Sequence, residues 1–352
     1  MADKHKDVAP KGATLRLRLV ALWLLTVAVL SGCLAPQQTP LKTITGLAMG
    51  TSYTVKWLVV NESAEQAYPD QINALVRQIE ESMSTYMDAS DLSGLNGAPA
   101  GIWHSVPADM AALIGHAQTI SQSTDGAFDI TIGPVVDLWG FGPDPKPETI
   151  PTADQLDALR PLVGYQQIAV RQDPPAVKKA NTNAIDLSAI AKGYAVDRVA
   201  QWLQARGIAH FMVEIGGEIR TRGTKLEGQP WRIAIESPGQ QARSVFEVVR
   251  VEDRALATSG NYRNYYEENG IRYAHTLDPK SLQPVRHKLA SVTVMTDNAA
   301  EADALATALM VLGEDQGVAW AALHKVPAYF IIWQDDQFVS RQTAGFEQFI
   351  EP

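Results

Sequence analysis

Three stretches decide the fold: HFMVEI at residues 210–215, WRIAIE at 231–236 and VFEVVRV at 245–251. Each is short and rich in β-branched and aromatic residues, which predicts a β-strand. No helical pattern lies between these stretches. Consecutive strands without intervening helices favour an α+β fold, with mixed or largely antiparallel sheets and packed helices, over a regular doubly wound fold.

Further elements are predicted on both sides of these strands. Residues 44–60 alternate well enough for a strand, with Tyr53, Val55 and Trp57 on one side. No internal linker interrupts 42–352, so we expect one body there. The other predicted elements are strands at 273–277 and 291–296, helices at 72–86, 110–120, 188–206 (ended by Gly207) and 299–312 (ended by Gly313), and a helix opened by a Thr152/Gln155 capping box.

The composition is that of a globular protein, with 352 residues and a formal net charge of -9. An acidic chain offers no broad basic surface for a nucleic-acid backbone, so we expect no nucleic-acid partner. The single cysteine excludes a disulfide scaffold, an iron–sulfur cluster and a thiolate zinc site, because each of these needs several sulfurs.

The N-terminus has the layout of a secretory signal. Several basic residues precede an apolar run at 19–30, and Cys33 follows two small residues. A helix of that length rises roughly 18 Å, too short for the ~30 Å hydrocarbon core. The segment LSGC at 30–33 resembles a bacterial lipobox, so we expect a lipoprotein signal peptide at 1–32, lipidation of Cys33 and a lipidated tether at 33–41. A signal anchor with an incidental cysteine is the alternative.

Common enzyme signatures are missing from the sequence. It contains no G-x-x-x-x-G-K-[ST], G-x-G-x-x-G, H-E-x-x-H or G-x-S-x-G segment. Walker-type nucleotide hydrolysis and serine-esterase chemistry therefore lose support. Irregular polar segments between apolar ones are the remaining candidates, because loops on a scaffold carry binding groups.

Three of these segments have two interpretations each. The glycine of MGT at 49–51 favours a plain bulge over the close approach of a ligand. Tyr86, on the apolar stripe of its helix, is either a core aromatic or a site residue. At 125–142, two glycine-containing turns can hold a planar ring against Phe128 or Trp139, but aromatic residues beside glycine are also typical of core packing.

A strand-to-helix transition is predicted at 186–193. Asp186 and Ser188 can cap the helix start, and Lys192 lies one turn inside it. Free amides and a cation at that place favour a phosphate. Capping alone does not explain Lys192 beside Gly193, so an anion site and a plain helix start both stay open.

Asp303 and Thr307 are four residues apart on a predicted helix, so their oxygens lie on one face. A carboxylate and a hydroxyl in that arrangement can hold Mg²⁺, which prefers hard oxygen ligands and completes its coordination with water and substrate phosphate. The alternative is an exposed acid and a threonine that bonds back to its own helix.

The order of these segments resembles that of the ApbE family, and the resemblance spans about residue 41 to the C-terminus. The matching motifs are MGT (49–51), STY (84–86), GAFDITIGP (126–134), DLS (186–188) with KGYA (192–195), GG (216–217), TSGNY (258–262), HTLDP (275–279) and ADALAT (302–307).

The resemblance implies a T-fold-like catalytic body and the activity of an FAD:protein FMN transferase. In that reaction Mg²⁺ supports the transfer of FMN from FAD to a threonine or serine hydroxyl of a target protein, and AMP is released. The implied substrate is FAD, the implied metal is Mg²⁺, and the implied partners are flavoprotein subunits of sodium-pumping NADH:quinone oxidoreductases or RNF-type complexes.

The resemblance also implies site residues by their position in the motifs. This chain has Ala306 where some relatives carry an aspartate just before the threonine, so weaker metal binding or an additional water ligand is expected. The implied metal ligands are the Ala189 carbonyl, Asp303 and Thr307. The implied FAD contacts are Met49, Tyr86, Ala127, Phe128, Asp129, Asp186, Lys192 and Leu277.

His275 is our candidate for the base that takes the proton of the acceptor hydroxyl, because a neutral imidazole accepts a proton near neutral pH. A structural role for His275, with a nearby carboxylate as the base, is the alternative. Two further functions stay open: an FAD pyrophosphatase that yields FMN and AMP, and a flavin-binding lipoprotein without turnover.

The expected location is the bacterial cell membrane, where the lipid anchor holds the chain facing the periplasm, and the inner membrane is favoured. Leu34 is not the aspartate often associated with inner-membrane retention, so the choice between inner and outer membrane stays open.

Overall fold

The structure is a computed structural model that describes residues 40–143, 149–239, 244–262, 264–268 and 270–351. Residues 1–39, and with them the predicted signal peptide and Cys33, lie outside the described residues. Leu41–Pro352 form one compact unit. No helix in the described part of the chain has the length and apolar character needed to span a membrane.

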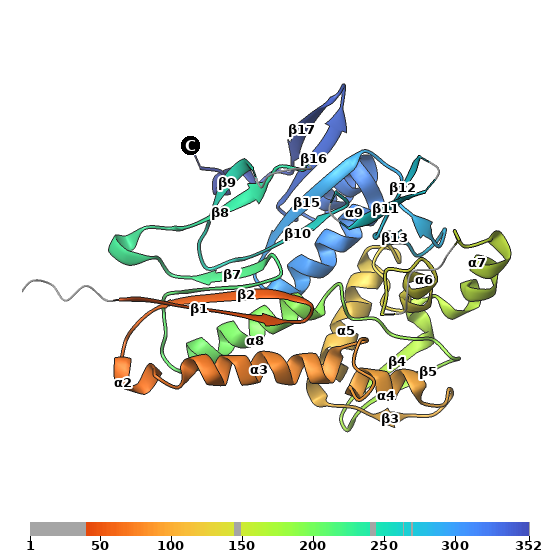
Figure 1. Cartoon of the computed structure of the whole chain (residues 1–352), viewed down its shortest axis with the longest axis horizontal. Helices are drawn as coiled ribbons and strands as arrows, with labels where there is room; N and C mark the ends of the chain where they lie inside the picture. Colours follow the sequence, from red (N-terminus) through yellow and green to blue (C-terminus); the bar gives the residue numbers. More distant parts are fainter. Residues whose placement is uncertain (1–39, 144–148, 240–243, 263, 269, 352) are drawn as a thin grey trace, which may run out of the picture. The chain divides into compact units, whose positions relative to one another are not determined.

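The centre of this unit is an eight-stranded sheet in which every neighbouring pair is antiparallel (Figure 1). Most of its strands are joined in hairpins, which explains the runs of strands without helices in the sequence. The order across the sheet is β1 (Leu41–Ala48), β2 (Thr51–Leu58), β6 (Phe211–Ile215), β7 (Glu218–Arg222), β10 (Ala255–Gly260), β15 (Leu289–Thr296), β16 (Ala328–Gln334) and β17 (Gln337–Gln342).

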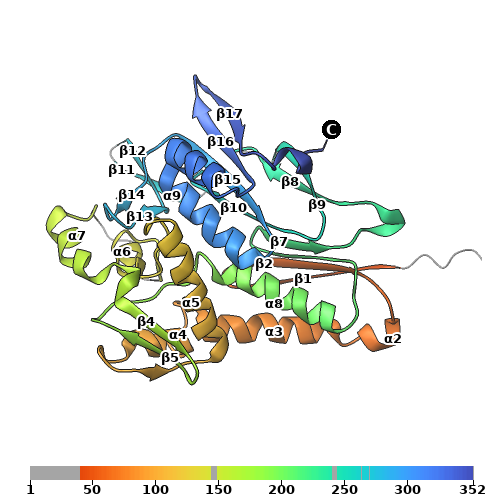
Figure 2. The ribbon, with the colours of Figure 1, turned by 180° about the vertical axis from the view of Figure 1, so that it is seen from behind.

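The two faces of the sheet are covered differently. Helices α3 (Tyr68–Met83), α8 (Ala191–Ala205) and α9 (Ala299–Leu323) cover one face (Figure 2). The hairpin of β8 (Trp231–Glu236) and β9 (Val245–Val251) packs on the other face through buried Trp231 and Val249. Neighbouring strand residues alternate between these cores: Val213, Ala257 and Val294 face the helices, and Met212, Leu256 and Met295 face the hairpin.

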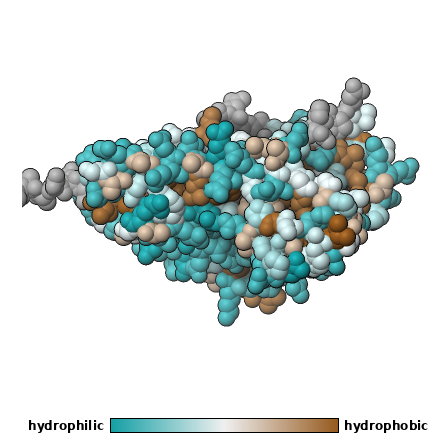
Figure 3. Space-filling model, turned by 90° about the horizontal axis from the view of Figure 1, so that it is seen from below, coloured by the Kyte–Doolittle hydropathy of each residue, from teal (hydrophilic) through white to brown (hydrophobic). Residues whose placement is uncertain are grey.

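Smaller elements surround the helix side of the sheet. The lower face, which carries α3, is mostly hydrophilic with scattered apolar side chains (Figure 3). A separate, smaller hydrophobic cluster forms around α6 and includes Trp139, Tyr273 and Leu277. The bounds of the remaining elements are α2 (Glu62–Glu65), α4 (Asp91–Gly97), α5 (Ala108–Ser123), α6 (Gly133–Leu138), α7 (Ala153–Leu159), β3 (His104–Ser105), β4 (Ile168–Gln172), β5 (Pro175–Lys179), β11 (Tyr265–Glu268), β12 (Ile271–Ala274), β13 (Leu277–Asp278) and β14 (Gln283–Pro284), with 3₁₀ turns η1 (Arg160–Leu162), η2 (Tyr165–Gln167), η3 (Leu226–Gly228) and η4 (Glu347–Phe349).

Several element boundaries differ from the sequence-based predictions. The predicted bulge at 49–51 is wrong: Met49 and Gly50 both have positive φ, at 53° and 71°, and they form the two-residue turn of the β1–β2 hairpin. The helix end predicted at Gly313 is borne out in the backbone, where one helical segment stops and a second one follows. Gly313 has φ 77° and ψ -174° and kinks α9, which continues to Leu323.

The helix predicted over 188–206 begins three residues later than expected. α8 starts at Ala191, and its N-cap residue Ile190 makes no side-chain capping bond, so the expected capping by Asp186 or Ser188 is wrong. The Asp186 carboxylate instead accepts from the Ser188 amide at 2.8 Å, within the turn that precedes the helix. The capping box of Thr152 and Gln155 is confirmed at the start of α7.

Helices α8 and α9 meet closely, and this junction positions the candidate site. A Cβ atom at Gly193 would overlap the backbone of Ala299, so only glycine allows this approach. Asp197 of α8 accepts from the amides of Ala299 and Ala300, each at 3.0 Å, and pairs with Arg220 at 2.5 Å. The start of α9 is therefore held against α8 by buried hydrogen bonds.

Candidate active site

A cavity of about 480 Å³ lies between α8, α9, the end of β10 and the segments around α6. Apart from Met49, all the site residues predicted within the described part of the chain line it. Met49 is elsewhere, in the β1–β2 turn, where its amide donates to Glu80 at 2.8 Å. Predicted site residues that are up to 221 positions apart in sequence, from Tyr86 to Thr307, thus share one cavity.

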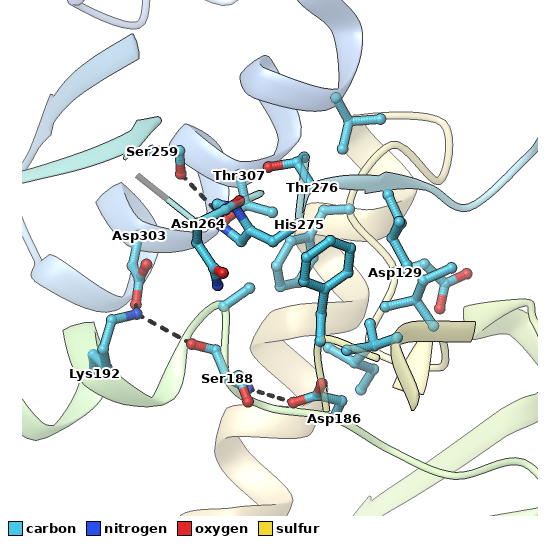
Figure 4. A pocket seen from close by; sticks show the side chains of 18 of the residues that line it. Asp129, Asp186, Ser188, Lys192, Ser259, Asn264, His275, Thr276, Asp303 and Thr307 are labelled. Carbon is cyan, nitrogen blue, oxygen red and sulfur yellow. Dashed lines mark hydrogen bonds and ion pairs between the residues drawn. The ribbon is translucent and has the colours of Figure 1, made fainter. Parts of the chain in front are cut away.

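Lys192 lies at the start of α8 and points toward α9 (Figure 4). Its ammonium nitrogen is 3.5 Å from Asp303, 3.5 Å from Glu218 and 3.2 Å from the Ser188 carbonyl oxygen. Burial lowers the pKa of Lys192, but the two carboxylates outweigh it and raise the pKa above its ordinary value. Lys192 is therefore a permanent cation in the cavity wall.

Glu218 is a site residue that the sequence-based prediction missed. It is 4% exposed, follows the β6–β7 turn at Gly216 and Gly217, and lines the cavity. Within the described residues its Oε2 has no hydrogen-bond partner. Burial raises the pKa of Glu218 to about 8, against the lowering effect of Lys192. The GG pair predicts a turn, but only the pairing of β6 with β7 brings the next residue to Lys192.

Asp303 and Thr307 project from one face of α9, as the spacing predicts. Asp303 is 3% exposed, and its Oδ2 accepts from the Gly193 amide at 3.1 Å. The Thr307 hydroxyl lies 3.4 Å from that of Ser259. The interpretation of Asp303 as an exposed acid is therefore wrong.

The donor atoms suit a hard cation. Ala189, Asp303 and Thr307 line the same cavity and offer a carbonyl, a carboxylate and a hydroxyl oxygen, the ligand types that Mg²⁺ prefers. No group of three His, Cys, Asp or Glu side chains that could hold a metal occurs in the described residues. A cation here would have to complete its coordination with water and ligand oxygens.

His275 lines the same cavity and lies between β12 and β13 in the chain. Its Nδ1 lies 3.0 Å from the Asn264 carbonyl oxygen, which only accepts. In the neutral ring Nδ1 therefore carries the proton and Nε2 carries the lone pair. Burial lowers the pKa of His275, the Asn264 hydrogen bond opposes this, and the charge of Lys192 lowers it further. A neutral imidazole with an accepting Nε2 is thus the stable form.

Asp129 has a structural function that the sequence did not reveal. Its Oδ1 accepts from the amide and hydroxyl of Thr131 at 2.8 and 2.6 Å, and its Oδ2 accepts from the Tyr165 amide at 2.8 Å. Burial raises its pKa, and these bonds lower it. Asp129 also lies across the cavity from Lys192 (Figure 4). Its side chain therefore holds the loop, and the amides of Ala127 and Phe128 donate to the carbonyl oxygen and the hydroxyl of Thr124.

Aromatic side chains form another part of the lining. Phe128 is buried, and Phe141 packs edge-on to His275 at 6.4 Å between ring centroids. Tyr86 is 64% exposed and lies beyond the end of α3 at Met83, so it is not a core aromatic. Its hydroxyl lies 3.4 Å from the Phe141 carbonyl oxygen. The cavity thus combines a charged wall with an aromatic wall, which suits a ligand with phosphates at one end and a planar ring at the other.

Comparisons with known proteins agree with this geometry. The ApbE family profile matches residues 49–330. The chain is 39% identical to an FAD:protein FMN transferase of Vibrio cholerae, covering 93% of this chain and 98% of the relative, and 38% identical to one of Haemophilus influenzae, covering 95% and 99%. The crystal structure of the Pseudomonas stutzeri flavinyl transferase ApbE, apo form, is similar with a TM-score of 0.82 at 38% identity, covering 89% and 98%. The predicted fold class is confirmed.

Proposed function

The chain belongs to the ApbE family, and on that premise we propose that it is an FAD:protein FMN transferase. The observation that carries the proposal is the convergence of Lys192, Asp303, Thr307 and His275 on one cavity that also has an aromatic wall. This function and enzyme class agree with the activity named for the relatives over most of the chain.

In the proposed reaction, the hydroxyl oxygen of an acceptor threonine or serine attacks the FAD phosphorus nearest riboflavin. The bond from that phosphorus to the bridging oxygen breaks, AMP leaves, and a phosphoester joins FMN to the acceptor. Lys192 faces the charge that develops on the phosphate oxygens. His275 Nε2 takes the hydroxyl proton, because the ring proton of the neutral imidazole is on Nδ1, which bonds to the Asn264 carbonyl.

The proposed Mg²⁺ site consists of the Ala189 carbonyl, Asp303 and Thr307. A bound Mg²⁺ would neutralise negative charge on the phosphate oxygens of the substrate. Asp303 is oriented for such ligation by the Gly193 amide. Ala306 is buried and supplies no ligand, so the protein contributes one carboxylate to the site, and a weakly held metal is expected.

Transfer is tested with the full-length chain in mild detergent, FAD, Mg²⁺ and a flavodomain that carries an acceptor threonine. Mass spectrometry should show the flavodomain heavier by one FMN, with an equal amount of AMP released, and Asp303→Ala should abolish both. AMP and free FMN without a labelled flavodomain would instead establish a pyrophosphatase. FAD that stays bound and intact with Mg²⁺ present would establish a binding protein.

The same proposal extends to the setting of the enzyme. We propose that a lipid on Cys33 anchors it to the bacterial cell membrane facing the periplasm, with residues 33–41 as the tether. The proposed acceptors are flavoprotein subunits of NADH:quinone oxidoreductase or RNF-type complexes. Labelling cells with a radioactive fatty acid should mark the wild-type chain and not Cys33→Ala.

A further inference from the structure

A second cavity, of about 830 Å³, opens at the end of the sheet near β12. Figures 1 and 2 show β12 and the β16–β17 hairpin at this same end. The residues of interest in its lining are Ala274, Arg272, Arg286, Lys288, Trp333 and Phe338. The proposed transfer reaction uses none of these side chains.

The lining is basic although the chain as a whole is acidic. Arg272, Arg286 and Lys288 are exposed, and no ion pair among the described residues neutralises them. Arg272 is held in place: its guanidinium lies 3.4 Å over the Tyr265 ring and donates to the Tyr262 carbonyl at 3.2 Å. Exposed cations around a cavity, one of them held in place, attract an anionic partner.

An aromatic edge completes the cavity. Trp333 is 43% exposed and packs edge-on to Phe338 with 4.7 Å between ring centroids. Exposed tryptophan beside arginine is typical of the residues that dominate protein–protein interfaces. This lining therefore suits a peptide segment that carries both acidic and apolar side chains.

The second cavity shares a thin wall with the catalytic cavity. Ala274 lines the second cavity, and its neighbour His275 lines the catalytic one. Likewise, Gly260 lines the catalytic cavity and its neighbour Asn261 lines the second one. The Thr276 hydroxyl, on the catalytic side, donates to Asn261 Oδ1 at 2.7 Å, which ties the two segments together. A segment held in the second cavity therefore lies directly behind the proposed base.

We propose that the second cavity is the docking site for an acidic segment of the acceptor flavoprotein. The inference rests on the proposed function, because the acceptor is the reactant that the catalytic cavity does not itself position. The cations and the aromatic edge hold residues that flank the acceptor threonine, on the outer side of the wall that the second cavity shares with the catalytic cavity. Opposite charge also speeds the encounter, so docking weakens as the salt concentration rises.

The first experiment measures binding of the acceptor separately from the transfer reaction. The probe is a fluorescently labelled apo-flavodomain whose acceptor threonine is flanked by acidic residues, and its affinity for the FAD-loaded full-length chain is read by anisotropy. Arg286→Glu and Lys288→Glu should each weaken binding by about tenfold and flatten its salt dependence. Lys42→Glu, a matched reversal of an exposed cation on β1, should leave it unchanged.

Steady-state transfer provides the second measurement. Arg286→Glu should raise the KM for the flavodomain by about tenfold, leaving kcat and the Kd for FAD unchanged. A flavodomain whose flanking acids are changed to lysine should regain affinity for Arg286→Glu. Unchanged flavodomain binding in the Arg286 and Lys288 variants would overturn the docking proposal. A loss of FAD affinity in the same variants would also overturn it, because it would show that the second cavity binds a nucleotide.

The two proposals can fail separately. A wild-type chain that binds the flavodomain and never labels it would refute the transferase and leave the docking result standing. Labelling that is insensitive to Arg286→Glu, Lys288→Glu and Trp333→Ala would refute the docking site and leave the transferase standing.

Discussion

Asp303 accepts a hydrogen bond from the backbone amide of Gly193 at 3.1 Å, across the junction of α8 and α9. The same carboxylate oxygen lies 3.5 Å from the ammonium of Lys192. The proposed metal ligand and the proposed phosphate-binding cation are thus positioned by one contact between two helices. Their geometry depends on how closely the helices approach.

Gly193→Ala should disrupt that approach, because the added Cβ would overlap the Ala299 backbone. We expect a destabilisation of about 2 kcal/mol from the forced backbone shift, together with loss of FAD turnover as Asp303 moves from Lys192. Urea denaturation measures the first effect. Gly94→Ala in α4, where nothing lies within 4 Å of the new Cβ, is the control and should be neutral or slightly stabilising.

Asp303→Asn should preserve the fold and abolish the metal-dependent reaction. The amide has nearly the shape of the carboxylate but lacks its charge, so we expect Mg²⁺ affinity in the FAD-loaded chain, read by calorimetry, to be lost and turnover to fall about 100-fold or more. Asp315→Asn lies on the same helix with an 89% exposed side chain and should behave as wild type. Normal Mg²⁺ binding by Asp303→Asn would contradict the proposed site.

Lys192→Met should destabilise the fold because it leaves the buried Asp303 carboxylate without its cation. We expect the free energy of unfolding to fall by about 3 kcal/mol. This value is at the low end for a broken buried ion pair, because the Lys192 side chain is 26% exposed. Adding Glu218→Gln should change this loss little below about pH 8, where the Glu218 carboxyl keeps its proton, and a double-mutant cycle measures the coupling. Lys280→Met breaks only an exposed pair with Asp125 and should leave the free energy of unfolding nearly unchanged.

Glu218→Gln should change how stability depends on pH. The folded chain keeps the Glu218 proton up to about pH 8, whereas an unperturbed glutamate releases it near 4.5. Protons bound by the folded state alone make wild-type stability fall as pH rises through this window. Thermal denaturation at a series of pH values should show a smaller decline in Glu218→Gln. An identical slope in the two proteins would show that Glu218 ionises normally.

The pKa of His275 should set the acidic limb of the pH–rate profile for transfer. Burial lowers its pKa, so the neutral imidazole persists below the ordinary histidine pKa of about 6.5. Transfer should therefore remain active at a lower pH than an ordinary histidine allows, and the limb should vanish in His275→Gln together with most of the rate. His324→Gln, at the C-terminal end of α9, is the control. Near-normal turnover by His275→Gln with FAD bound would rule out the base.

Much of the architecture was predictable because it depends on local pattern. The strands at 231–236 and 245–251 appear at the predicted positions, since β-branched runs bounded by turns have few alternatives. The Asp303–Thr307 pair follows from helical spacing alone. A prediction failed where a glycine had another function than expected: Gly50 forms the β1–β2 turn together with Met49 and is not part of a bulge.

The candidate site was only partly predictable from residues. Motif order gave the cavity residues, but Asp129 required the structure, because its partners Thr131 and Tyr165 show that the carboxylate holds a loop. Glu218 was missed because its importance comes from a neighbour 26 residues earlier on another element, Lys192. No local propensity encodes such a contact.

By itself, the sequence determined an acidic chain with one cysteine, an antiparallel α+β body and an ordered set of family motifs. Tertiary structure alone decided that Lys192 stands between two buried carboxylates, that His275 presents Nε2 and that a basic cavity lies behind it. The physical reason is the distance along the chain over which the interactions act. Strand and helix patterns arise from interactions between residues a few positions apart, whereas charge, burial and tautomer depend on which distant segments the packed core brings together.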